Sequence, residues 1–182
     1  MARGAWIDID AKGIAELAGQ VSATPVQVEA AMRSTYGKLG RWARTQAVRG
    51  LSSKLGMQQK ILRRRVRHFR LQNGVSTHGG AKVWFGMKPI RMSDLRPRRD
   101  GKGVRADGGH YVEGAFIRTI NGKRKVFKRD GASRLPVREV TIDVSDPVQV
   151  YIEDHLIGSP EFEHQFFKFF EHELKWRTRT QT

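Results

Sequence analysis

The spacing of apolar residues changes twice along this chain, and this change restricts its possible folds more than any other feature. From residue 11 to 68 apolar side chains recur every three or four positions, as on one face of an α-helix. From residue 69 to 145 many alternate with polar residues, which is typical of β-strands, and after residue 146 the helical spacing returns. This order predicts a single α+β domain over residues 1–182, in which an antiparallel β-sheet packs against a long N-terminal helix, with a C-terminal amphipathic helix.

The helical N-terminal region, residues 11–68, is expected to contain three helices. The first runs from about Ala11 to Gln20. The second begins at Thr24-Pro25, because threonine is a good N-cap, proline suits the first turn, and Gln27 completes a capping box. It continues as one long amphipathic helix from Val26 to about Leu51. The third, from Met57 to His68, has a weak apolar edge and a very basic surface.

The β-rich region, residues 69–145, contains one especially clear local signal. Strands over Tyr111–Ile120 and Lys125–Arg129 are joined by Asn121-Gly122, a dipeptide that tolerates the positive φ of a tight hairpin turn. Further strands are predicted near residues 67–71, 82–87 and 137–144. The segment 93–109 contains four glycines and no apolar period, so we expect a mobile basic loop there.

The C-terminal region, residues 146–178, is predicted to form two helices. Asp146-Pro147 begins the first, which ends near His155, and Ser159-Pro160 precedes the second, from Glu161 to Arg177. One face of the second helix is rich in aromatic residues, namely Phe162, Phe166, Phe169 and Phe170, followed by Leu174. Such a face is typical of a core-facing helix, and a subunit interface is the alternative.

The composition predicts a folded protein with an acidic partner. The chain has 34 Lys and Arg residues against 18 acidic ones, a formal net charge of +16. It has no cysteine, which excludes disulfides, thiol nucleophiles and cysteine-ligated metals. The first ten residues do not resemble a signal peptide, and no apolar run approaches the roughly 18 residues of a membrane span. A soluble cytoplasmic protein without membrane contact is therefore the initial expectation.

The charge is unevenly distributed. The segment from Arg33 to Arg138 has a net charge of +23, whereas the two flanks together have −7. This division fits a head-to-tail contact between subunits, and equally a basic protein whose acidic tail is solvated.

No residue pattern indicates catalysis. The six histidines are scattered, and none lies in an H-E-x-x-H motif. Residues 101–106 match the spacing G-x-G-x-x-[GA], but they follow no predicted strand and begin no predicted helix. P-loop and G-x-S-x-G motifs are absent. We therefore expect no enzymatic activity, no catalytic residue, no metal site and no cofactor.

Basic clusters are the candidate binding residues. Their side chains can neutralise phosphates, or they can contact acidic protein neighbours, since the planar guanidinium of arginine suits both partners. They include no base-reading motif, so any contact with nucleic acid should be directed to the backbone and sensitive to salt. The candidates are Arg63, Arg64, Arg65 and Arg67; Arg96, Arg98, Arg99, Lys102 and Arg105; and Lys123, Arg124 and Lys125.

Four short motifs follow one another in the hairpin region, between residues 112 and 137. They are Val112-Glu113-Gly114-Ala115-Phe116-Ile117, Asn121-Gly122-Lys123, Val126-Phe127-Lys128-Arg129 and Arg134-Leu135-Pro136-Val137. In this order they resemble the signature stretch of the minor tail protein Z family of tailed phages and prophages. The hairpin residues of the motif are Gly114, Ala115, Phe116, Asn121 and Gly122. Gly114 suits a bulge, and Phe116 with Val126 suits a cross-strand apolar pair.

This resemblance implies a structural virion protein, made in the host cytoplasm, that completes the head-proximal end of a phage tail. In this role it is expected to form a hexameric ring around the DNA channel and to help join heads to tails. Expected partners are further copies of the chain, tail terminator, tail tube or connector proteins, and DNA without sequence preference. The alternative is a free sequence-nonspecific nucleic-acid-binding protein of ribosomal or chromatin type.

Overall fold

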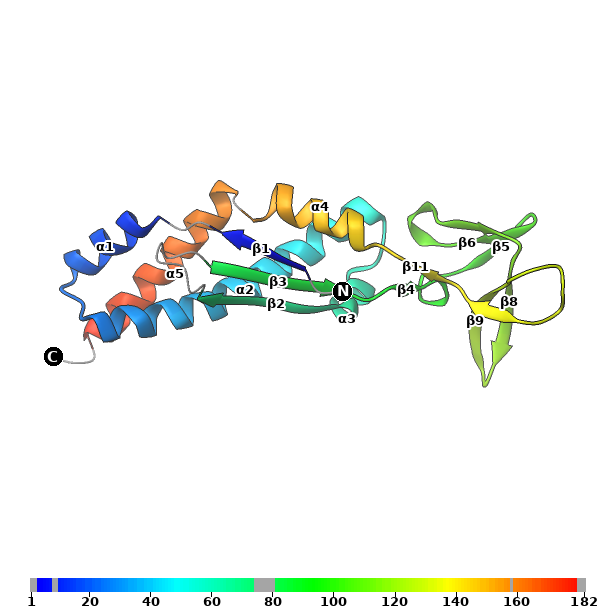
Figure 1. The fold of residues 1–182 in the computed structure, drawn as a ribbon, viewed down its shortest axis with the longest axis horizontal. Helices are drawn as coiled ribbons and strands as arrows, with labels where there is room; N and C mark the ends of the chain where they lie inside the picture. The colour runs from blue at the N-terminus through cyan, green and yellow to red at the C-terminus, as the bar shows by residue number, and fades with distance from the viewer. Residues whose placement is uncertain (1–2, 8–9, 74–80, 158, 180–182) are drawn as a thin grey trace. The chain divides into compact units, whose positions relative to one another are not determined.

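The computed structural model describes residues 3–7, 10–73, 81–157 and 159–179, and it describes side chains for 10–66, 88–157 and 159–179. The chain forms two compact units (Figure 1). Unit 1 contains Met1–Ala47, Arg67–Gly86 and Gln149–Thr182, and unit 2 contains Val48–Val66 and Met87–Val148. The predicted α+β class, with antiparallel sheets, a long helix packed on them and a C-terminal helix, is confirmed. That the whole chain is one domain stays a prediction.

The helices begin where the capping signals place them. The first helix, α1 (Ala11–Gln20), starts after Asp10, whose side chain accepts a hydrogen bond of 2.9 Å from the Lys12 backbone N–H. The second, α2 (Pro25–Leu55), starts with the predicted capping box, since the backbone N–H groups of Thr24 and Gln27 donate to each other's side-chain oxygens at 2.8 and 3.3 Å. These local contacts confirm both predicted helix starts.

Helix α2 extends further than predicted. It ends at Leu55 rather than near Leu51, because the small residues before that point stay helical. The chain leaves the helix at Gly56, which has a φ of +59° that glycine adopts without strain. The other two helices at the C-terminal side are α4 (Ser145–His155) and α5 (Pro160–Arg179), as expected from Asp146-Pro147 and Ser159-Pro160.

The core of unit 1 lies between α2 and α5. Phe162, Phe166 and Phe170 are at most 1% exposed, and they recur at the four-residue spacing that lines one helix face. The ring centroids of Tyr36 and Phe166 are 6.1 Å apart. Burial of each phenylalanine contributes up to about 2–3 kcal/mol. The aromatic face of α5 is therefore core, although Phe169 on its margin is only half-buried.

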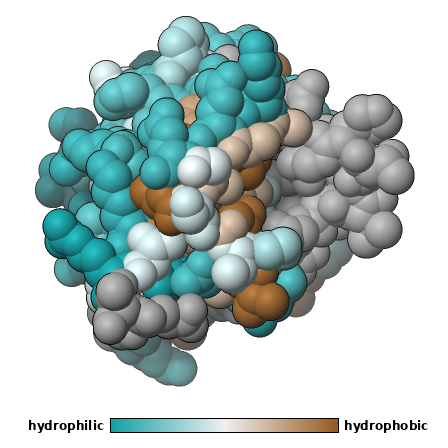
Figure 2. Space-filling model, turned by 90° about the vertical axis from the view of Figure 1, so that its left-hand side faces the viewer, coloured by the Kyte–Doolittle hydropathy of each residue, from teal (hydrophilic) through white to brown (hydrophobic). Residues whose placement is uncertain are grey.

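Helix α1 lies on α5 at Gly13. A Cβ atom at Gly13 would approach the Phe167 ring to 2.9 Å, so the missing side chain permits this close packing. None of the residues of α1 is fully buried. Figure 2 faces the end of unit 1 where α1 lies in Figure 1, and it shows an apolar strip between hydrophilic regions.

A three-stranded sheet completes unit 1, in the order β1-β3-β2. Its strands are β1 (Arg3–Ile7), β2 (Val66–Asn73) and β3 (Ala81–Met87). Strand β1 was not expected from its mixed sequence, and it pairs antiparallel with β3. The helix predicted over Met57–His68 is shorter, because α3 (Gln59–Arg65) ends where β2 begins.

Unit 2 consists of α3, the adjoining end of α2, the first residues of α4 and three small sheets. One sheet contains β5 (Arg98–Asp100), β6 (Gly103–Arg105) and β7 (Tyr111–Glu113). A second contains β8 (Ala115–Ile120), β9 (Lys123–Arg129) and β10 (Val137–Glu139). The third pairs β4 (Ile90–Arg91) with β11 (Thr141–Ile142), so the strand predicted over 137–144 is two short strands in different sheets.

The prediction of a mobile loop over residues 93–109 is wrong. The segment contains β5 and β6, with the 3₁₀ turns η1 (Met92–Asp94) and η2 (Asp107–Gly109) beside them. Leu95 and Val104 are fully buried, and they attach the segment to the core of unit 2. The apolar anchors are too few and too irregular to produce a visible period.

The predicted hairpin is confirmed, with one change in pairing. Asn121 and Gly122 have φ values of +50° and +72°, as a tight turn requires, and β9 begins directly after them at Lys123. Phe116 lies opposite Phe127, not Val126, and their ring centroids are 6.1 Å apart. At Gly114, φ is +71°, and this residue separates β7 from β8, which pair with different strands.

No helix among the described residues is long and apolar enough to cross a membrane.

Candidate nucleic-acid or partner interface

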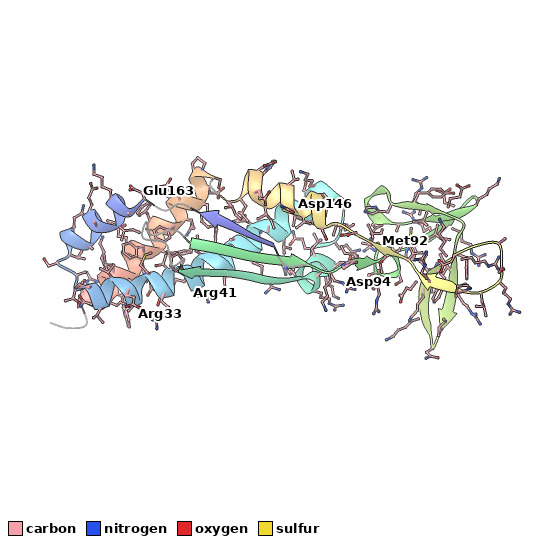
Figure 3. The ribbon with its side chains drawn as sticks, in the orientation of Figure 1. Arg33, Arg41, Met92, Asp94, Asp146 and Glu163 are labelled. Atoms are coloured by element: carbon pink, nitrogen blue, oxygen red, sulfur yellow. The ribbon has the colours of Figure 1, made fainter. Side chains whose placement is uncertain are left out.

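The positive charge of the chain is concentrated in unit 2. This unit has 21 of the 34 Lys and Arg residues and 8 of the 18 acidic residues, a formal net charge of +13, whereas unit 1 has +3. Figure 3 shows long nitrogen-tipped side chains projecting away from the strands of unit 2. The predicted basic clusters fall almost entirely within this unit.

The first cluster is partly engaged by neighbouring side chains. Arg65 forms an ion pair with Asp94, labelled in Figure 3, at 2.9 Å. Arg63 donates a hydrogen bond of 3.2 Å to the side-chain oxygen of Gln59, and Arg64 is exposed. The fourth predicted member, Arg67, lies on β2, and its side chain is outside the described residues.

Two arginines of the second cluster face acidic groups. Arg105 forms an ion pair with Asp100, and its guanidinium lies 5.3 Å from the ring centroid of Tyr111. Arg96 is 74% exposed, and its Nε lies 4.0 Å from a carboxylate oxygen of Asp107. Arg105 therefore stabilises the β5-β6 hairpin in addition to any contact with a partner.

In the third cluster, at the β8-β9 turn, two of the three basic residues contact neighbouring groups. Lys125 lies 4.0 Å from Glu139, and Arg124 donates a hydrogen bond of 3.3 Å to the carbonyl oxygen of Pro97. The second contact joins the hairpin to the segment before β5. It brings together two clusters that are about 25 residues apart in the sequence.

Four predicted residues on the two hairpins of unit 2 form neither an ion pair nor a side-chain hydrogen bond with another described residue. We call them the unpaired basic set, and all four are exposed on the β5-β6 and β8-β9 hairpins. An exposed guanidinium or ammonium without an acidic neighbour retains its full charge for a phosphate or a carboxylate. The members are Arg98, Arg99, Lys102 and Lys123.

An open cleft of about 580 Å³ lies beside this set. Its lining includes Arg96, Arg98 and Arg124, so it combines the second and third clusters, together with Asp107. Three guanidinium groups around one opening are suited to a bound anion such as a phosphate group.

The motif residues that lie on the β8-β9 hairpin shape the hairpin itself. Ala115 is 7% exposed, and Asn121 and Gly122 form the turn. Phe116 is half-buried and lies under the guanidinium of Arg129, 5.8 Å from the ring centroid. The motif therefore builds the hairpin that presents Lys123, and Gly114 allows the chain to change sheets.

Sequence reasoning missed a second feature of this sheet. Arg118, Arg129 and Arg134 line a groove of about 390 Å³ together with apolar side chains. The available signal was the alternation along β8, which places residues 116, 118 and 120 on one face of the strand.

The described residues contain no group of three or more His, Asp or Glu side chains that could bind a metal ion. One carboxylate of unit 2, that of Asp143, has a shifted pKa. The side-chain hydroxyl and the backbone N–H of Ser145 donate to Asp143 at 2.5 and 2.9 Å, and these hydrogen bonds lower the pKa of Asp143 below its usual value. This contact is a turn at the start of α4, not an acid-base pair.

Comparison with models of known protein families, with curated proteins and with solved structures finds no match. The proposals below therefore depend on the chemistry of the chain and on the resemblance of residues 112–137.

Proposed function

We propose that this chain is a structural virion protein that completes the head-proximal end of a phage tail and helps to join heads to tails. The observation that carries the proposal is the unpaired basic set, which leaves unit 2 with exposed positive charge on two hairpins. The family expectation adds a ring around the DNA channel, in which such a surface faces either phosphates or acidic virion proteins.

The electrostatics favour a polyanionic partner. A surface with a net charge of +13 raises the local concentration of a negatively charged partner and accelerates its association. Contact with phosphates releases counterions, so the affinity should fall steeply as salt increases. Because the unpaired set contains no base-reading pattern, the contact is independent of nucleotide sequence.

The expected partners remain those of the resemblance. They are other copies of the chain in a hexameric ring, a tail terminator, tail tube or connector protein, and DNA. The protein acts without a cofactor and catalyses no reaction in this proposal.

The first experiment measures molar mass by light scattering at low and high salt, with and without DNA of unrelated sequence. A discrete oligomer near the hexamer that persists without DNA supports the tail-ring proposal. A monomer that binds every DNA with a steep salt dependence contradicts it and supports the alternative below.

The second experiment tests the unpaired basic set in assembly. The triple variant Arg98→Ser, Arg99→Ser, Lys102→Ser should remain folded but block the joining of heads to tails. The matched control, Lys12→Ser, Arg41→Ser, Lys168→Ser, removes the same charge from exposed positions of unit 1 and should leave joining intact. An unchanged yield of infectious particles with the first variant would contradict the proposal.

A free sequence-nonspecific nucleic-acid-binding protein is the second candidate. The cleft with its three arginines favours it, because this arrangement can bind a phosphate without any virion partner.

A further inference from the structure

A second surface of unit 2 combines apolar and basic character. The groove on the β8-β9-β10 sheet has a volume of about 390 Å³, and we call it the sheet groove. Two of its apolar side chains are notably exposed, Leu135 at 69% and Ile120 at 36%. Its apolar lining comprises Phe116, Ile120, Phe127, Leu135 and Val137.

The arginines of the sheet groove have no acidic partner. Among the described residues, none of Arg118, Arg129 and Arg134 forms an ion pair, although Arg129 lies over the Phe116 ring. This contrasts with Arg138 on the neighbouring strand, which is paired with Asp130. An apolar groove lined by unpaired guanidinium groups favours an occupant with an aliphatic side chain next to carboxylates.

The chain itself contains a segment with this chemistry. Residues 139–167 include seven Asp or Glu residues and no Lys or Arg. Within this segment α4 exposes Val150 at 48%. Glu153 and Asp154, both exposed, follow it by three and four positions, so all three side chains share one face of the helix.

Other exposed apolar residues lack this combination. Arginine side chains already cover the rings of Tyr111 and Trp176, at 5.3 Å in both cases. Val26 lies near Glu29, but that carboxylate is paired with Arg33 at 3.0 Å. Among the described residues outside the groove, Val150 is therefore the exposed apolar side chain whose acidic neighbours have no basic partner, since Glu153 accepts a hydrogen bond of 2.9 Å only from the neutral Gln149 amide.

We propose that α4 of one copy docks into the sheet groove of a second copy, with Val150 against the apolar lining and Glu153 and Asp154 paired with its arginines. The two surfaces differ, so the contact is heterologous and can repeat from copy to copy until a ring closes. This inference deepens the proposed function, because it rests on self-assembly and names the surfaces that mediate it.

The test uses two charge-reversal variants of the full chain. The groove variant is Arg129→Glu, Arg134→Glu, and the helix variant is Glu153→Lys, Asp154→Lys. In sedimentation velocity at low salt, the wild type should associate, and each variant alone should associate at least tenfold more weakly. An equimolar mixture of the two variants should associate again beyond the dimer. The acidic helix of the groove variant fits the arginine groove of the helix variant, and the lysine-bearing helix of the helix variant fits the glutamate-bearing groove of the groove variant.

Combining all four substitutions in one chain should restore association, because the charges are then exchanged across the contact. This rescue also separates a lost contact from a misfolded groove variant. A control, Arg41→Glu, Lys168→Glu, changes the charge equally at exposed positions of unit 1 and should associate like the wild type.

Three results would overturn the inference in different ways. A wild type that stays monomeric at every concentration removes the self-assembly on which the proposed function also depends. A groove variant that associates as tightly as the wild type overturns the docking surfaces and leaves the proposed function intact. A groove variant that loses affinity for DNA while its association is unchanged assigns the groove to nucleic acid.

Discussion

Among the side chains that the structure describes, Glu173 on α5 and Thr35 on α2 are the two buried polar ones. The Glu173 carboxylate accepts hydrogen bonds from Lys38 and from Arg177, and the Arg177 guanidinium also donates to the Ser34 hydroxyl at 2.7 Å. Burial alone raises the pKa of Glu173, but the two cationic donors outweigh it, and the pKa lies below its ordinary value. This cluster ties α5 to α2 within unit 1.

The ionised Glu173 should stabilise the protein at neutral pH. Because its folded-state pKa is lowered, the stabilisation is present above the unfolded pKa near 4.5 and disappears as the pH falls through the folded value. We expect Glu173→Gln to cost about 2 kcal/mol at pH 7 and much less at pH 3. Urea denaturation at both pH values measures this difference. An equal cost at the two values would contradict it.

The pKa of Tyr36 on α2 gives a second pH-dependent test. Burial raises its pKa to about 12, because the phenolate is poorly solvated in the core of unit 1. The raised pKa means that the protein is destabilised as the pH rises above 10, the ordinary tyrosine value. An ultraviolet titration should show a late component near pH 12 that is missing in Tyr36→Phe. A wild type and variant with the same final step would refute the assignment.

The helices and strands whose ends are fixed by neighbouring residues in the sequence were predicted well. The capping box at Thr24 and the turn at Asn121-Gly122 depend on residues within four positions of each other, and both are present. Strand β1 and the β5-β6 hairpin were missed because their stability comes from distant partners. Strand β1 pairs with β3, and the β5-β6 segment is fixed by burial of Leu95 and Val104.

The same distinction applies to the candidate site. The sequence identified the basic residues, but it did not separate the paired Arg65 and Arg105 from the unpaired Arg98 and Arg99. Pairing depends on which acidic side chains the fold brings near. The sheet groove was missed for a similar reason, since it needs the register of β8 against β9.

Gly103 lies on β6, the second strand of the β5-β6 hairpin, where the neighbouring strand β7 leaves no room for a side chain. A Cβ atom there would lie 2.4 Å from the carbonyl oxygen of Val112 on β7, a backbone atom that cannot move easily. We expect Gly103→Ala to cost at least about 3 kcal/mol, a value typical of a steric clash in a packed region. The control Gly101→Ala has φ of +56° but free space, so it should cost only about 1–2 kcal/mol. Thermal denaturation compares the two. Equal losses would show that β6 and β7 can separate.

For the whole molecule, the concentration of charge in unit 2 has a measurable cost. Mutual repulsion among 21 basic groups with only 8 acids destabilises the compact state, and salt screens that repulsion over about 8–10 Å.

The melting temperature should therefore rise by about 2–4 °C between 20 mM and 200 mM NaCl, a shift equivalent to about 1 kcal/mol. The fourfold variant with serine at each position of the unpaired basic set should show a smaller increase. A melting temperature that falls with salt in the wild type would contradict this account.

Unit 1 takes residues from both ends and from the middle of the chain, whereas every residue of unit 2 precedes Gln149. On the ribosome, all the strands of unit 2 are therefore synthesised before translation of α5 begins. The buried face of α2, including Tyr36 and Leu39, has to wait for Phe162 and Phe166. A nascent chain paused at this stage can form its basic hairpins while its first long helix is still open to a chaperone.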